Sequence, residues 1–132
     1  MDIRVRTRRR CEIIDITKEA SECCRQVGGS GLLQVYCPHT TAGIAVNENA
    51  DPSVKEDVLG WLERAVPRDD PRYRHAEGNA DAHIKAILTG TQTAVPYRDG
   101  TLLLGRWQGV FLMEFDGPRT RTVRLTILRE AP

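Results

Sequence analysis

Three histidines, His39, His75 and His83, are the residues whose type and number point most directly to chemistry. They lie in the middle third of the chain, in segments dense with polar residues that core packing does not require. Three imidazoles are the ligand number of an open zinc site, which keeps a fourth position for water or substrate. The spacing alone does not bring the rings together. It leaves two alternatives, a shared metal or catalytic site and unrelated surface or capping histidines.

Three carboxylates, Glu48, Asp51 and Glu77, lie nearest to the histidines in the sequence. Each could orient an imidazole or act as a general base. Asp51 also precedes Pro52, and the capping of a helix that begins there is enough to explain it. Glu77 stands before another predicted helix, where the helix dipole favours a carboxylate.

Hydroxyls and cations that could bind phosphate are spread over the chain. They are Thr40 and Thr41 beside the first histidine, together with Lys85, Arg106, Arg119 and Arg121. Trp107 and Gln108 lie in a glycine-flanked junction of two strands, where the tryptophan could be a core residue or a platform for a ring. The chain has no Walker loop and no GxGxxG motif, so nucleotide binding by those routes is unsupported.

Cys37 lies two residues before His39, and a thiol beside an imidazole can be a nucleophile or a metal ligand. The other cysteines, Cys11, Cys23 and Cys24, form no CxxC motif and are expected to be reduced and mostly buried. The sequence leaves open whether the Cys37 thiol faces the imidazole or the core.

The elements that must position these side chains follow from hydrophobic periodicity and turn residues. Helices are predicted over residues 17–27, from 52 to the residue before Pro67, and from 80 to 88, with Asn79 as the cap of the last one. Helical spacing predicts core positions at Val54, Val58, Trp61, Leu62 and Ala65 on the second helix and at Ile84, Ile87 and Leu88 on the third. The long polar loop between these two helices is a candidate functional segment.

Strands, or strand pairs, account for most of the remaining chain. They are predicted over residues 3–16, 31–37, 43–47, 91–97, 102–104 and 107–115, and in a final strand that alternates apolar and polar residues from Thr122 to Ile127. Runs of strands with few helices predict one α+β domain over residues 1–132, with mainly antiparallel β-sheets and two to three helices.

Composition narrows the classes of partner. The 19 basic and 18 acidic residues of this 132-residue chain leave a formal net charge of +1, so no overall field attracts nucleic acid. No apolar run approaches the roughly 20 residues of a membrane span, and no apolar segment follows the basic start of the chain. We therefore expect no nucleic-acid partner, no membrane partner and a cytoplasmic location.

Five polar blocks, taken in order, resemble the YjbQ family of uncharacterised proteins. They are His-Thr-Thr-Ala at 39–42, Asn-Glu-Asn-Ala-Asp-Pro at 47–52, His-Ala-Glu-Gly-Asn at 75–79, His-Ile-Lys at 83–85 and Gly-Arg-Trp-Gln at 105–108. The resemblance runs over nearly the whole chain. It implies a small α+β protein that assembles as a homotrimer, with a histidine cluster near a subunit boundary. Arg106 departs from the pattern, because the family often has a small hydroxyl residue there.

The resemblance implies a secondary thiamine-phosphate synthase, which joins a pyrimidine diphosphate to a thiazole phosphate and releases pyrophosphate. A divalent ion, zinc or magnesium, would be held by His39, His75 and His83. Carried over by position, the catalytic residues would be Glu48, Asp51, Glu77, Lys85 and Gln108, and Thr40 and Trp107 would bind the small phosphorylated substrate. Thr41, Arg106 and Arg119 are added to the substrate-binding candidates because a hydroxyl or a guanidinium can bind phosphate. Glu114 also belongs to the polar motif. Two alternatives remain, a metal-dependent hydrolase of a small phosphorylated or acyl compound and a non-enzymatic trimeric binding protein.

Overall fold

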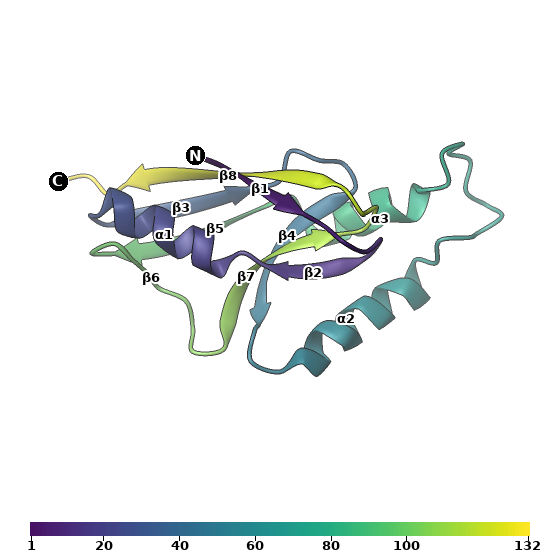
Figure 1. Cartoon of the computed structure of the whole chain (residues 1–132), viewed down its shortest axis with the longest axis horizontal. Helices are drawn as coiled ribbons and strands as arrows, with labels where there is room; N and C mark the ends of the chain where they lie inside the picture. Colours follow the sequence, from purple (N-terminus) through teal and green to yellow (C-terminus); the bar gives the residue numbers. More distant parts are fainter.

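Two antiparallel sheets and three helices make up the protein, whose computed structural model describes residues 1–132 (Figure 1). The five-stranded sheet has the order β1 (Asp2–Arg6), β8 (Thr120–Arg129), β3 (Gly31–Tyr36), β5 (Gln92–Arg98) and β6 (Thr101–Leu102). The three-stranded sheet has the order β2 (Glu12–Asp15), β7 (Gln108–Glu114) and β4 (Ala42–Glu48). Every strand pairing is antiparallel, which confirms the predicted α+β class.

The main core lies between the five-stranded sheet, the first helix and one face of β7. Helix α1 (Thr17–Val27) has the predicted bounds and buries Ala20, Cys23 and Cys24 in this core. The inward residues of β3 and β8 alternate with outward ones, as the pleat of a strand requires. All four cysteines are free thiols, and three of them are buried, as expected.

Strand β7 is covered on both faces. Val110 and Leu112 join the main core, whereas Phe111, Met113 and Phe115 form a second core with residues of helices α2 (Pro52–Ala65) and α3 (Ala80–Thr89). A strand buried on both faces reads as a continuous apolar run, which explains the sequence from 110 to 113.

The prediction that α2 buries its whole apolar face is wrong. Leu62 is its one fully buried residue, Trp61 is 58% exposed and Ala65 is exposed. In Figure 1, α2 lies at the lower right, apart from the five-stranded sheet. Leu62 and Val58 pack on the second core, whereas Val54 and Trp61 border an open groove.

The predicted core positions of α3 are also wrong. Ile84, Ile87 and Leu88 are exposed, with Ile87 at 80%, and the helix instead turns Ala82 and Ala86 inward. These small residues let α3 approach β4 closely. A Cβ at Gly43 would lie 2.6 Å from the carbonyl oxygen of Gly90, the residue that follows α3, so only glycine fits at position 43.

The buried face of α3 also carries an ion network. Asp81 accepts two hydrogen bonds from the guanidinium of Arg10 and one from the ammonium of Lys85, at 2.8–3.0 Å. Lys85 also donates to Glu63 on α2, so the network ties both helices to the turn between β1 and β2. Although burial opposes ionisation, the hydrogen bonds from Arg10 and Lys85 lower the pKa of Asp81 to about 2.

The helix starts agree with the prediction at one position and differ at another. The Asp51 side chain caps α2 by accepting a hydrogen bond from the Ser53 backbone N–H at 3.0 Å. Asn79 makes no capping hydrogen bond: its Nδ2 donates to Asp116 at 2.8 Å, and its Oδ1, the atom that would accept from the helix, has no partner. None of the three helices has the length and apolar character needed to cross a bilayer.

Asp81→Asn should destabilise the fold by about 3–5 kcal/mol, because it leaves the partly buried Arg10 without its charged partner and the buried Lys85 with Glu63 alone. The free energy of unfolding from urea titrations measures this loss. Since the pKa of Asp81 is lower in the folded state than its ordinary value of 3.8, the wild-type advantage should be full above that pH. It should shrink as the pH falls towards 2. Glu22→Gln, in an exposed pair with Arg25, is the control and should have little effect.

Candidate functional site

A pocket of about 410 Å³ lies between the end of β3 and helix α3. It contains two of the three histidines, one from the segment after β3 and one from α3. Its lining consists of Tyr36, Cys37, Pro38, His39, Thr40, His83, Ala86, Ile87 and Thr91. None of these residues is acidic, and the two imidazoles and the hydroxyls of Tyr36, Thr40 and Thr91 are among its polar groups.

His39 is held at the pocket wall by a backbone contact. The backbone N–H of Thr122, on β8, donates a hydrogen bond of 2.9 Å to Nε2 of the imidazole. Burial lowers the pKa of His39 below its ordinary value of 6.5, and the positive charge of Arg121 lowers it further. Both effects favour the neutral ring.

A buried ion pair lies behind His39. Arg121 donates to both carboxylate oxygens of Glu114, and it also donates to the Thr41 hydroxyl at 2.8 Å. Thr7 donates a further hydrogen bond to Glu114 at 2.9 Å. Burial opposes ionisation of Glu114, but the hydrogen bonds from Arg121 and from the backbone hold the pKa of this carboxyl below its usual value. Thr41 is therefore committed to the fold, whereas Thr40 borders the pocket.

His75 and Glu77 lie beside the pocket at the start of α3. The ring of His75 meets that of His83 edge-on, with 5.2 Å between the centroids. A Glu77 carboxylate oxygen lies 3.6 Å from Nε2 of His75. The structure thus groups a carboxylate and two imidazoles, and His83 is the member that reaches the pocket.

Within one copy of the chain, the histidines are not arranged as a ligand set. No group of three or more His, Cys, Asp or Glu side chains is close enough to hold a metal ion. His39 and His83 face one pocket, but Nε2 of His39 already accepts the Thr122 hydrogen bond. The residues that one copy supplies therefore do not fit a divalent ion.

Three further candidates have structural partners. Lys85 is buried and paired with Asp81 and Glu63, so its ammonium does not face the pocket residues. Cys37 is buried at the pocket wall, and burial raises the pKa of its thiol, which disfavours the nucleophilic thiolate. Arg119 is half-exposed and donates to Asp116.

The other five candidates lie at the opposite end of the three-stranded sheet. They are Glu48, Asp51, Arg106, Trp107 and Gln108. The seven residues of β4 separate this group from Thr41 by roughly 20 Å. The Gln108 side chain accepts a hydrogen bond from the Gly105 N–H. The guanidinium carbon of Arg106 lies 4.7 Å from the centre of the exposed Trp107 ring. Of the two alternatives for Trp107, the structure excludes a core residue, because its ring is 56% exposed.

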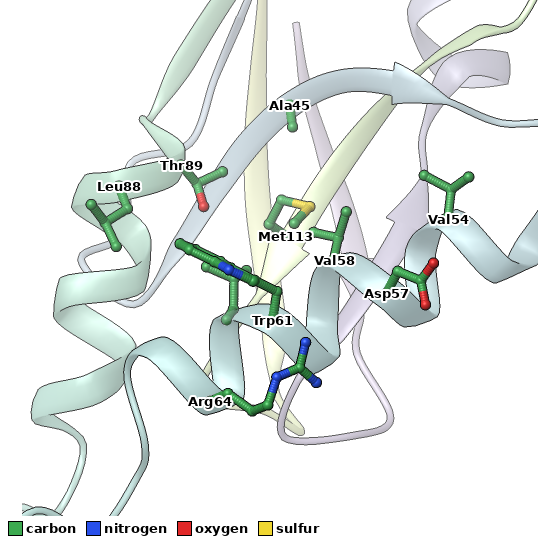
Figure 2. A pocket seen from close by; sticks show the side chains of 10 residues that line it. Ala45, Val54, Asp57, Val58, Trp61, Arg64, Leu88, Thr89 and Met113 are labelled. Atoms are coloured by element: carbon green, nitrogen blue, oxygen red, sulfur yellow. The ribbon is translucent and has the colours of Figure 1, made fainter.

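A second, larger hollow of about 760 Å³ lies between α2 and α3 (Figure 2). Figure 2 shows Trp61 extending from α2 towards Leu88 on α3, with Met113 of β7 behind them and Asp57 and Arg64 at the rim. We call this hollow the α2–α3 groove. The sequence predicts core positions for its apolar helix residues Val54, Val58, Trp61, Leu62 and Leu88, because an apolar helical stripe looks the same whether a core or an open groove lies beside it.

Sequence reasoning also missed partners of the predicted site. The Asp81–Lys85 pair has a spacing of four residues along α3, a signal of helical ion pairs that was available in the sequence. The contact between Thr122 and His39 joins residues 83 positions apart and had no local signal.

A model of the family described as UPF0047 protein YjbQ-like matches residues 1–130. The UPF0047 protein YugU of Bacillus subtilis is 45% identical over 127 residues, which cover 96% of each chain. A UPF0047 protein of Methanocaldococcus jannaschii is also 45% identical, over 94% of this chain and 90% of the relative.

Solved structures agree with this likeness. An uncharacterised YjbQ/UPF0047 protein of Clostridium acetobutylicum has a TM-score of 0.94 and 42% identity, over 97% of this chain and 99% of that one. A conserved hypothetical protein of Thermus thermophilus has a TM-score of 0.92 and 43% identity over the same shares.

His39 should titrate below pH 6.5 in the folded protein, because burial and Arg121 both disfavour its charged form. The unfolded chain then binds more protons than the folded one just below that pH, so the free energy of unfolding should fall as the pH drops. NMR titration of the imidazole signals measures the pKa. A value at or above 6.5 would contradict the packing described for this ring.

Proposed function

Because the chain belongs to the YjbQ/UPF0047 family, we propose that its histidine pocket binds a small phosphorylated molecule and acts as a secondary thiamine-phosphate synthase. In this reaction a pyrimidine diphosphate loses pyrophosphate and a thiazole phosphate captures the remaining carbon centre. The bond from the methylene carbon to the diphosphate oxygen breaks, and its electron pair leaves on pyrophosphate. A new bond forms between that carbon and the thiazole nitrogen.

The observation that carries the proposal is the group of possible hydrogen-bond donors in the pocket, the imidazoles of His39 and His83 and the hydroxyl of Thr40. No acidic residue lines it, and the buried carboxylate of Glu114 is paired with Arg121. Arg119 and Arg121 both lie close enough to His39 to lower its pKa. Fixed donors and charges of this kind stabilise a leaving anion without having to reorganise during the reaction.

His83 is the residue we assign to the departing phosphate. Its ring lines the pocket, and the edge-on contact with His75 restrains its orientation. From this position His83 can donate a hydrogen bond or a proton to the leaving oxygen. Glu77, beside His75, supports the pair. Thr40 supplies a hydroxyl at the same wall.

The binding of a divalent ion at the histidines stays a prediction. Zinc or magnesium, if bound, would neutralise charge on the leaving pyrophosphate. The side chains of one copy do not form a ligand set, so no step of the proposed reaction passes through the ion.

We also propose that the α2–α3 groove is covered by a second copy of the chain in a homotrimer. Large exposed apolar patches mark protein interfaces, and the α2–α3 groove includes the exposed side chains of Trp61 and Leu88. Asp57 and Arg64 both line the groove at separate places on α2, so copies related by rotation can pair opposite charges there.

Helix α3 borders both the proposed trimer interface and the histidine pocket. Leu88 lines the α2–α3 groove, whereas Ile87 and His83 line the histidine pocket, so α3 is the wall between the two hollows. Trp107 lies roughly 20 Å away along β4 and could stack on a substrate ring only in a neighbouring copy's pocket.

His83→Ala should lower the rate of thiamine-phosphate formation by about 100-fold or more, because it removes a donor to the leaving phosphate. The assay supplies both phosphorylated precursors in metal-replete buffer and detects the joined product. Arg98→Ala, an exposed change at the far end of β5, is the control and should keep the wild-type rate. Wild type that forms no product would refute the transferase, and phosphate release without joining would indicate the hydrolase.

Trp61→Glu should convert the trimer to monomers, because it places a charge in the apolar interface. Sedimentation velocity measures the change in mass, and circular dichroism should show an unchanged fold, since Trp61 is mostly exposed in the single chain. Val27→Glu, at the end of α1, is the matched control and should stay trimeric. A wild-type protein that sediments as a monomer would contradict the assembly.

A further inference from the structure

One nitrogen of the His39 imidazole, Nε2, already accepts a hydrogen bond within the protein. The backbone N–H of Thr122 points at Nε2 from 2.9 Å, and a nitrogen that accepts a hydrogen bond from an amide carries no proton. The proton of the neutral ring must therefore be on Nδ1.

The register of the five-stranded sheet explains why this contact forms. Tyr36, the last residue of β3, lies opposite Arg124 of β8, so continued pairing would place Pro38 opposite Thr122. Strand β3 has ended there, and the Thr122 N–H is left without a strand partner. The His39 side chain accepts its hydrogen bond instead.

A second set of hydrogen bonds fixes the segment from Pro38 to Thr41 at its other end. Arg121, the neighbour of Thr122, donates to the hydroxyl and the carbonyl of Thr41 while it is paired with Glu114. The segment from Pro38 to Thr41 is thus fastened to two consecutive residues of β8. Its imidazole cannot rotate to present Nε2 to a ligand without losing the Thr122 contact.

Nδ1 of His39, by contrast, has no partner in the protein. The buried side-chain nitrogens and oxygens that lack a hydrogen bond are Arg10 Nε, Asn79 Oδ1 and the Tyr97 hydroxyl, so Nδ1 is not enclosed in the core. The ring lines the pocket that also contains His83 and Thr40. Its N–H is a fixed donor that is still available to a ligand.

We propose that His39 binds the phosphorylated substrate as a neutral hydrogen-bond donor, through Nδ1–H to a phosphate oxygen, and that it serves neither as a general base nor as a metal ligand. This inference rests on the proposed function for the identity of the ligand. The two pocket histidines then have different roles. His39 positions the phosphate by donating a hydrogen bond without losing its proton, and His83 is free to transfer a proton.

The tautomer is measured directly by ¹⁵N NMR of the protein labelled in its imidazoles, with and without inorganic pyrophosphate. The expected spectrum has a protonated Nδ1 and an unprotonated Nε2 for His39, and saturation with pyrophosphate should shift the Nδ1–H signal. A proton on Nε2, or an Nδ1–H signal that does not move when pyrophosphate binds, would overturn the proposal.

Two isosteric variants test the role through affinity. Asparagine places its amide where Nδ1 lies, whereas glutamine places its amide where Nε2 lies. His39→Gln should lose about 10- to 100-fold in affinity for pyrophosphate, the effect of one hydrogen bond to a charged group. His39→Asn should keep most of the affinity. Equal losses in both variants, together with equal loss of zinc binding, would identify a metal ligand and overturn the donor role.

The same titrations separate this proposal from the proposed function. Wild type that binds no pyrophosphate and forms no thiamine phosphate would refute both. Wild type that binds pyrophosphate, with His39→Gln binding as tightly, would refute the role of His39 alone. Circular dichroism of each variant establishes that it is folded before its affinity is compared.

Discussion

The buried ion pair between Glu114 and Arg121 is the interaction on which the pocket depends. Glu114 ends β7 in the three-stranded sheet, and Arg121 lies near the start of β8 in the five-stranded sheet, so the pair joins the two sheets where they meet. Thr7 and Thr41 complete its hydrogen bonds. Breaking such a pair leaves an uncompensated buried charge, so this junction and the histidine segment attached to it are fixed together.

The close packing of α3 supplies the other wall. Gly43, Ala82 and Ala86 let the helix lie tightly against β4, and the buried Asp81 and Lys85 secure its inner face. The helix therefore presents His83 to the pocket on one side and Leu88 to the α2–α3 groove on the other. One helix thus borders both the pocket of the proposed chemistry and the groove of the proposed assembly.

Local patterns in the sequence predicted the elements well, because capping residues, glycines and periodicity act over a few residues. Helix α1 and the capping of α2 by Asp51 follow directly from them. Burial on α2 and α3 could not be predicted, since an apolar stripe does not reveal whether its own core or another surface covers it. The separation of Trp107 from the histidines and the Thr122 contact depend on strand register, which no local pattern encodes.

A crystal structure of the protein with inorganic pyrophosphate would test the central claim most directly. We expect pyrophosphate to lie between α3 and the end of β3, with one oxygen within hydrogen-bond distance of Nδ1 of His39 and another beside His83. The backbone N–H of Thr122 should still donate to Nε2 of His39. Pyrophosphate bound only near Arg106 and Trp107, or an ion bound to Nε2 with the Thr122 contact broken, would contradict it.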